Sequence, residues 1–291
     1  MRGGNRVGQA RQTVERLQLG LTLHRLRLAA DKSQQEAAEV IGRSAGRLSQ
    51  VENGKGALGT EELTRLLDFY RVSGVERATV LALGRASRRR QPRLGYLDSL
   101  PDSYVRFMDL LAAAQRISWY ECGIIPGLVQ SPSYVTGIHR AGSSLRPDEE
   151  TTERIAFRRN LQQQVLSVGK AESIDVIFTE DALLHVVGDA SVMREQVLHL
   201  LQLQEQHPVL SIRVIALDTP DNPGLGGGLV SLEYDTAAPI AYATSLYGPP
   251  IYYDQPAPTE RMRNLFEGVA DIALSPRDSR TMLLDFLARS S

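Results

Sequence analysis

The sequence predicts two domains, an all-α N-terminal domain of five helices and an α+β C-terminal domain with an antiparallel sheet. The 291 residues, 42% of them hydrophobic, are enough to build two ordinary globular domains. The first ninety residues contain capped amphipathic segments without a long β-branched run, whereas strand-like runs begin only after Tyr96. Pro92 and Gly95 mark the expected boundary, which gives domains at 1–92 and 96–291.

The first two helices follow from leucine spacing and from a capping motif. Leucines from Leu17 to Leu28 recur at helical spacing and predict one long amphipathic helix that ends near Ala30. Residues 33–36 read Ser-Gln-Gln-Glu, a capping box that starts a second helix. Gly42 ends this helix, because glycine readily takes the left-handed conformation that follows a helix.

The remaining N-terminal helices are predicted from caps and amphipathic spacing. Ser44 is the expected cap of a third helix over 45–52, which Asn53-Gly54 closes. Thr60 is the expected cap of a short fourth helix, whose first turn holds two glutamates that suit the helix dipole. A fifth helix is expected over about 74–90.

The C-terminal region alternates helical and strand-like runs irregularly, which favours an α+β domain over a regular βαβ array. We expect helices at about 101–116, 131–140, 148–167, 180–185, 189–206, 257–273 and 276–289. The strand candidates are 173–179, 210–216, 228–234, 239–246 and 251–253. Turn residues separate the last three, so we predict an antiparallel meander with helices packed on one face.

Charge is divided unevenly along the chain. Residues 1–95 carry 18 Lys and Arg against 9 Asp and Glu, a net charge of +9. The remaining 196 residues carry a net charge of −10, which returns the −1 of the whole chain. A basic segment followed by an acidic one indicates that the first part meets a polyanion and the second does not.

Several other classes of protein are disfavoured by composition. Cys122 is the single cysteine, so the chain has no intramolecular disulfide and no cysteine cluster for a metal. The sequence has neither a membrane-length apolar run nor an apolar signal segment at its start, and we expect a cytoplasmic protein without a membrane partner. Residues 224–228 are glycine-rich but lack the Lys and Ser/Thr of a phosphate loop. We therefore expect no enzyme activity, catalytic residue, cofactor or metal site.

Residues 33–54 combine two capped helices around a glycine turn, a 22-residue helix-turn-helix. In such a unit the first helix crosses the DNA backbone and the second presents its N-terminal side chains to the major groove. Over residues 19 to 72 the sequence resembles the lambda-repressor-like, XRE-type helix-turn-helix family. The motif that carries the resemblance is Ser33-Gln34-Gln35-Glu36-Ala37-Ala38, Gly42 and Ser44-x-x-x-Leu48-Ser49-Gln50-Val51-Glu52-Asn53-Gly54.

The resemblance implies a set of DNA-contacting positions. They are Gln34, Arg43, Ser44, Ala45, Gly46, Arg47, Ser49, Gln50, Asn53 and Lys55. Arg47 and Gln50 are the expected base readers, because a guanidinium can bond guanine and a carboxamide can bond adenine at two atoms each. The resemblance places Gln34 against a phosphate and the recognition helix, and Arg43, Asn53 and Lys55 beside phosphates. The alternative for each residue is a place on a solvated polar face.

Arg27 and Glu52 resemble a buried ion pair that ties the family's first helix to the end of its recognition helix. Such a pair would fix geometry more than it adds stability, because burying two charges is itself costly. The alternative is that both side chains point into water.

The region from about 100 to 285 resembles the domain of unknown function, also described as antitoxin-like, that follows this helix-turn-helix in actinobacterial regulators. The segments that carry this likeness are Ile125-Pro126-Gly127-Leu128-Val129-Gln130, Glu153-Arg154, Arg158-Arg159, Thr179-Glu180-Asp181-Ala182-Leu183, Met193-Arg194-Glu195-Gln196-Val197 and Ala273-Leu274-Ser275-Pro276-Arg277-Asp278-Ser279. The resemblance implies a transcriptional regulator that is often encoded beside a small partner protein.

These observations lead to one main hypothesis and two alternatives. We expect a homodimeric repressor or autoregulator that binds double-stranded operator DNA, with a C-terminal domain for dimerisation and for sensing a partner or effector. The first alternative is an antitoxin-like interaction protein that neutralises a small neighbour-encoded partner. The second is a regulator that senses a small-molecule effector.

Overall fold

The structure is a computed structural model, and it describes residues 13–88, 96–97, 103–141, 148–235, 237–244 and 251–289. The chain forms two compact units. The first holds residues 1–110 with the segments 234–240 and 249–255, and the second holds 111–233, 241–248 and 256–291. The boundary predicted at 92–95 lies outside the described residues, so it stays a prediction.

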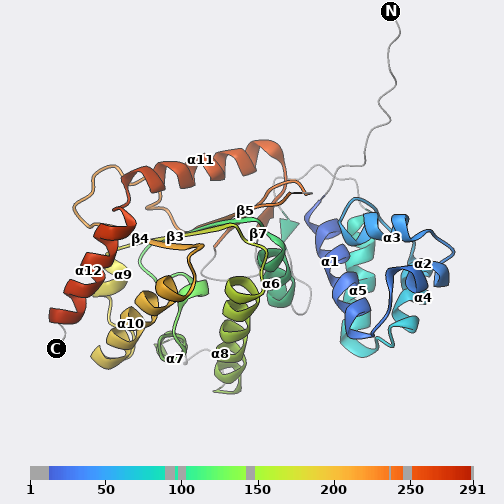
Figure 1. The fold of residues 1–291 in the computed structure, drawn as a ribbon, viewed down its shortest axis with the longest axis horizontal. Helices are drawn as coiled ribbons and strands as arrows, with labels where there is room; N and C mark the ends of the chain where they lie inside the picture. The colour runs from blue at the N-terminus through green and yellow to red at the C-terminus, as the bar shows by residue number, and fades with distance from the viewer. Residues whose placement is uncertain are drawn as a thin grey trace, which may run out of the picture. The chain divides into compact units, whose positions relative to one another are not determined.

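The first unit begins with five helices, and the predicted helical N-terminal region is confirmed (Figure 1). They are α1 (Val14–Ala29), α2 (Gln34–Val40), α3 (Ala45–Glu52), α4 (Thr60–Phe69) and α5 (Gly74–Ser87). Their core consists mainly of leucines from α1, α3, α4 and α5, among them Leu23, Leu48, Leu66 and Leu83, with Ala37 and Ala38 from α2. Each helix thus buries one apolar face against the others.

The caps show how local sequence sets the helix starts. Ser33 accepts a hydrogen bond from the Glu36 amide while the Glu36 carboxylate accepts from the Ser33 amide, so the predicted capping box is present. The cap predicted at Thr60 is wrong by one residue, because Gly59 is the cap of α4 and its amide donates to Glu62. Glu62, the third residue of the helix, thus makes the reciprocal bond of a capping box, while Gly59 has no side chain that could accept from the helix amides. The last residues of the predicted fifth helix, 89–90, lie outside the described ranges.

The sheet of the second unit is mixed, so the prediction of an antiparallel sheet is wrong. Its strands are β2 (Arg116–Glu121), β3 (Ser173–Thr179), β4 (Leu210–Ile215), β5 (Leu229–Glu233) and β6 (Ile240–Ala243), in the order β6-β5-β2-β3-β4. Strands β2, β3 and β4 run parallel, while β5 runs antiparallel to β2. In the first unit β1 (Tyr96–Leu97) pairs antiparallel with β7 (Ile251–Tyr253).

Two strands were missing from the prediction, and one of them decides the topology. No strand was expected over 116–121, yet β2 occupies the middle of the sheet between β3 and β5. The signal for a parallel sheet lies in β3, where Ile174, Val176, Ile177 and Phe178 are all buried, so that both faces of the strand are covered. Near-continuous apolar runs of this kind are typical of parallel strands covered on both sides. The short strand β1 was also not predicted.

Helices cover both faces of this sheet, which corrects the prediction of one covered face (Figure 1). They are α7 (Pro132–Ala141), α8 (Asp148–Gln162) with a π-helical extension (Gln163–Ser167), α9 (Asp181–Leu184), α10 (Ala190–Gln206), α11 (Pro256–Ile272) and α12 (Pro276–Arg289); α6 (Ser103–Ala113) precedes β2. Phe266 and Val269 of α11 pack on Tyr120, Ile177 and Leu229 of one face. Helices α7, α8 and α10 lie on the other side of the strands in Figure 1.

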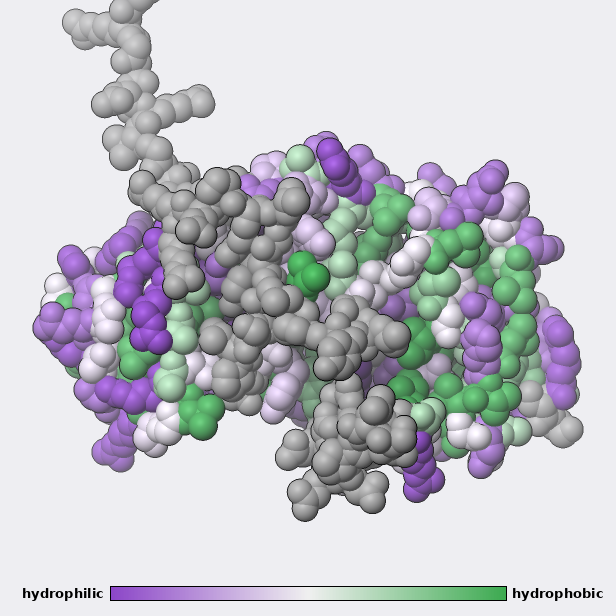
Figure 2. Space-filling view, turned by 180° about the vertical axis from the view of Figure 1, so that it is seen from behind, coloured by the Kyte–Doolittle hydropathy of each residue, from purple (hydrophilic) through white to green (hydrophobic). Residues whose placement is uncertain are grey.

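Hydrophobic residues are also present at the surface of the second unit. Leu184, Val186, Leu217, Leu225 and Leu284 each expose about half or more of their area. Figure 2 shows hydrophobic patches of this kind between hydrophilic side chains. Among the helices of the described ranges, none is both long and apolar enough to span a bilayer.

Candidate nucleic-acid interface

The helix-turn-helix consists of α2 and α3 joined by a glycine turn. Gly42 has φ +66° directly after α2, in the left-handed region where glycine carries no steric penalty. Ser44 caps α3 by accepting a hydrogen bond from the Arg47 amide. Gly54, with φ +70°, ends the helix in the same way that Gly42 ends α2. These local signals determine where the recognition helix begins and ends.

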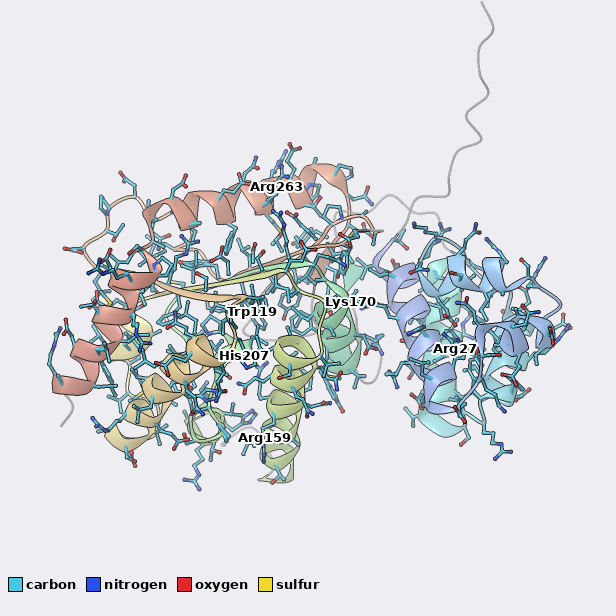
Figure 3. The ribbon with its side chains drawn as sticks, viewed as in Figure 1. Arg27, Trp119, Arg159, Lys170, His207 and Arg263 are labelled. Atoms are coloured by element: carbon cyan, nitrogen blue, oxygen red, sulfur yellow. The ribbon has the colours of Figure 1, made fainter. Side chains whose placement is uncertain are left out.

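The carboxylate of Glu52 joins three helices at the end of α3. Arg27 of α1 donates to both of its oxygens, with Nε–Oε1 and Nη2–Oε2 distances of 2.7 and 3.0 Å. Gln34 of α2 donates to Oε2 at 2.9 Å, and His24 Nδ1 lies 3.1 Å from the same oxygen. Arg27 and Glu52 are both buried, so this ion pair lies inside the unit (Figure 3 labels Arg27). We call these four side chains the Glu52 cluster.

Electrostatics keep the cluster charged despite its burial. Burial works against ionisation of Glu52, but hydrogen bonds from His24, Arg27 and Gln34 outweigh it and lower the pKa of Glu52 to about 2. The hydrogen bond to Glu52 raises the pKa of Arg27. The Arg27 guanidinium also donates to the Lys32 carbonyl at 2.9 Å, which ties the α1–α2 turn to the same group. The cluster therefore fixes α1, α2 and α3 together as an ion pair with satisfied hydrogen bonds.

Gly20 lets α1 approach the end of the recognition helix closely. A Cβ at Gly20 would lie only 2.5 Å from the Glu52 carbonyl oxygen and closer still to that of Val51. Backbone atoms cannot give way as a flexible side chain can, so this position requires glycine. Gly20 is not among the residues predicted from the sequence, although a glycine inside a leucine-rich helix was the available signal.

The outer face of α3 is open to solvent. Leu48 and Val51 are fully buried beneath it, whereas Gly46 and Gln50 are exposed and Ala45 and Ser49 are half-exposed. A Cβ at Gly46 would meet no atom within 4 Å. Ser44, Asn53 and Lys55 are exposed at the two ends of the helix. The positions that the resemblance assigned to DNA are thus all accessible: Arg43, Ser44, Gly46, Gln50, Asn53 and Lys55 are exposed, and Gln34, Ala45, Arg47 and Ser49 are partly exposed.

The two expected base readers interact with each other. Arg47 donates from Nη1 to Gln50 Oε1 at 3.3 Å and from Nη2 to the Ala57 carbonyl at 3.1 Å. Its guanidinium therefore lies along the turn after α3, where a Cβ at Gly56 would come within 2.9 Å of Nη1. Contact with a base edge would require Arg47 to leave these partners.

Arg43 and Gln34 are also held by protein groups. Arg43 donates to Glu62 Oε1 at 2.7 Å, and the second oxygen of Glu62 accepts from the Gly59 amide at 2.6 Å. Burial opposes ionisation of Glu62, but these bonds lower its pKa. Gln34 donates to Glu52, which corresponds to the contact with the recognition helix that the resemblance implies for it. The sequence predicts only that Glu62 favours the helix dipole, because its pairing with Arg43 depends on how α2 and α4 pack.

Helix α1 also contacts chain segments from the other end of the sequence within the first unit. The Val14 amide donates to Asp254 Oδ2 at 3.0 Å, which satisfies one of the free amides at the helix start. Arg25 Nε lies 3.5 Å from Asp109 Oδ2 on α6. Burial raises the pKa of Asp109 although Arg25 opposes the shift. The helix that braces the recognition helix is thus attached to residues beyond 100.

Two family models match the chain. A helix-turn-helix domain matches residues 18–80, which contain α2, α3 and the Glu52 cluster. A domain of unknown function (DUF5753) matches residues 104–285, more than half of the chain. The chain belongs to the DUF5753 family. In this DUF5753 protein both Asp109 and Asp254, which contact α1, come from the matched domain. No curated protein and no solved structure matches the chain.

The close approach at Gly20 gives a first prediction. Gly20→Ala adds a methyl group against the backbone of α3, and we expect it to lower the free energy of unfolding by about 1–3 kcal/mol. Gly46→Ala is the matched control, because the added methyl group meets open space and alanine favours helix by about 1 kcal/mol. Urea unfolding of the full chain measures both. Equal effects of the two substitutions would contradict the packing account.

The Glu52 cluster gives a second prediction, on pH. Because folding lowers the pKa of Glu52 from 4.5 to about 2, its stabilising contribution is complete above about pH 4.5 and is lost as the pH falls towards 2. We expect Glu52→Gln to destabilise the protein by about 3 kcal/mol at pH 7, since it leaves the Arg27 charge unpaired. The difference from wild type should shrink between pH 4.5 and 2. Glu39→Gln, at an exposed position of α2, is the control.

Proposed function

We propose that this protein is a sequence-specific DNA-binding transcriptional regulator that acts as a repressor or autoregulator through its helix-turn-helix. The observation that carries the proposal is the exposed face of α3, whose buried side is fixed by the Glu52 cluster. A rigid helix with one accessible polar face suits the major groove, where base edges carry a complete donor and acceptor code. The proposal assigns no catalytic step, cofactor or metal to the chain.

The accessible residues fall into two proposed roles. Arg47 and Gln50 read base edges, and Ala45 with Gly46 allows the helix to approach the groove floor closely. Arg43, Asn53 and Lys55 contact phosphates at the ends of the helix. The side chain of Lys55 is exposed and has no hydrogen-bond or ion-pair partner within the described ranges, so it can reach a phosphate without breaking a bond. Phosphate contacts position the protein, and base contacts specify the sequence.

The charge distribution supports the same division. The net positive charge of residues 1–95 attracts DNA, whereas the net negative charge of the remaining residues repels it. We propose that the DUF5753 domain serves dimerisation and sensing, and that a homodimer places two recognition helices about 34–36 Å apart on a pseudo-palindromic operator. Acting on operator DNA, the regulator would work in the cytoplasm, at the nucleoid.

The roles are separable by substitution. On an operator sequence selected from random DNA, we expect Arg47→Ala and Gln50→Ala each to weaken binding by about 1–3 kcal/mol, with little effect on random DNA. Lys55→Ala should weaken both kinds of complex alike and reduce the slope of log K against log salt by about 0.9. Fluorescence anisotropy at several salt concentrations measures these values.

Arg263→Ala is the matched control, because Arg263 is half-exposed on α11 and, among the residues that the structure describes, pairs only with Glu267 one turn away. This substitution should leave the affinity for the operator and the affinity for random DNA unchanged. A full-length protein that binds no DNA, or binds it without salt dependence, would refute the proposed function. Arg47→Ala with unaltered sequence preference would refute the assigned base reader alone.

Dimerisation has its own test. Sedimentation equilibrium of the full chain should give a dimer, and the selected operator should contain two half-sites about one helical turn apart. A monomer that occupies a single half-site would contradict this part of the proposal.

A further inference from the structure

A groove of about 330 Å³ lies between α8 and α10 in the second unit, a size within the range of small-molecule sites. Its two walls are polar. One wall presents Arg159, Gln162 and Gln163, and the other presents His199, Gln202 and Gln206. Figure 3 labels Arg159 on α8 and His207 just after α10, which also lines the groove.

The polar walls follow from the helix registers. Leu161 and Val165 on one side, and Val197 and Leu200 on the other, are buried in the core and fix how each helix is rotated. With that rotation, residues spaced three and four apart on each helix face the groove. Surfaces between neighbouring helices are normally filled by apolar side chains. Four glutamines line this one beside Leu166 and Leu203.

Most of these side chains have unused hydrogen-bonding capacity. Gln162 is the exception, because it donates to the Gln130 carbonyl at 2.8 Å and lies 3.3 Å from His199 Nε2. Arg159, Gln163, Gln202 and Gln206 have no hydrogen-bond or ion-pair partner in the part of the chain that the structure describes. A ligand in the groove can therefore bond to amides and a guanidinium without displacing a protein partner.

The groove favours an anion. Its described lining holds Arg159 and no carboxylate, while burial lowers the pKa of His199 and leaves that imidazole as a neutral hydrogen-bonding group. The nearby Glu205 is occupied by an ion pair with Arg280, 2.7 Å away. In addition, Gln163 and Ser167 belong to the π-helical extension of α8, a widened turn that occurs frequently at functional sites.

We propose that this groove binds a small metabolite that carries an oxyanion, a carboxylate or a phosphate, together with hydrogen-bonding groups. Arg159 pairs with the oxyanion, and the amides of Gln163, Gln202 and Gln206 bond to the rest of the ligand. That this metabolite acts as the effector of the regulator rests on the proposed function. That it binds to the groove is independent of the proposed function.

The test uses the full chain without DNA, with citrate, inorganic phosphate and uncharged glycerol as probes. We expect one of the two anions to bind at a single site in calorimetric titration, and the stronger one to identify the oxyanion as carboxylate or phosphate. The backbone amide resonances of 159–167 and 199–207 should shift with that anion, and glycerol should shift neither segment.

Substitutions then locate the site. Arg159→Gln should weaken binding about tenfold, the loss of one charge-assisted hydrogen bond. Gln202→Leu should also weaken it, whereas Arg263→Gln, the same charge change on α11, should not. Absence of binding by both anions, resonance shifts elsewhere, or equal effects of Arg159→Gln and Arg263→Gln would overturn the proposal. Because no DNA is present, such a failure would leave the DNA-binding proposal untouched.

Discussion

The buried carboxylate of Glu52 is the constraint on which the DNA-binding unit depends. A charge in the interior is tolerated only when it is paired and its oxygens are satisfied, and here Arg27, Gln34 and His24 together meet that need. These partners come from α1 and α2, so the end of α3 cannot shift without breaking bonds to both. The cluster thus holds the recognition helix in one position with polar contacts, while the leucine core supplies the burial.

The same first helix connects the recognition helix to the DUF5753 domain. Asp254 accepts from the first amide of α1, and Asp109 pairs with Arg25, which directly follows His24 of the Glu52 cluster. A change at these aspartates therefore acts on the helix that holds Glu52. Within the first unit, residues of the matched domain therefore contact the helix that positions α3.

Caps and turns depend on neighbouring residues, and these features were predicted from the sequence. Strand pairing and contacts between helices depend on residues far apart in the chain, and these features were missed. The capping box at Ser33, the cap at Ser44 and the glycines after α2 and α3 are local, so the helix-turn-helix was predictable. The position of β2 was not, because its partners β3 and β5 lie far along the chain. The ion pair of Arg27 and Glu52 was predicted from a family resemblance. Three other contacts can be seen only once the helices are packed: His24 with Glu52, Gly20 with the end of α3, and Arg43 with Glu62. The polar groove was equally out of reach, since it combines side chains from two separate helices.

A double-mutant cycle on Arg27 and Glu52 tests the central claim most directly. Arg27→Met, Glu52→Leu and the double variant are compared by amide hydrogen exchange at Leu48 and Val51, the buried residues of α3. If the cluster fixes this helix, each single substitution should lower the free energy of exchange by about 3–5 kcal/mol, because it strands a buried polar partner, and the double substitution should cost much less than the sum. Additive effects of the two single substitutions would contradict the account.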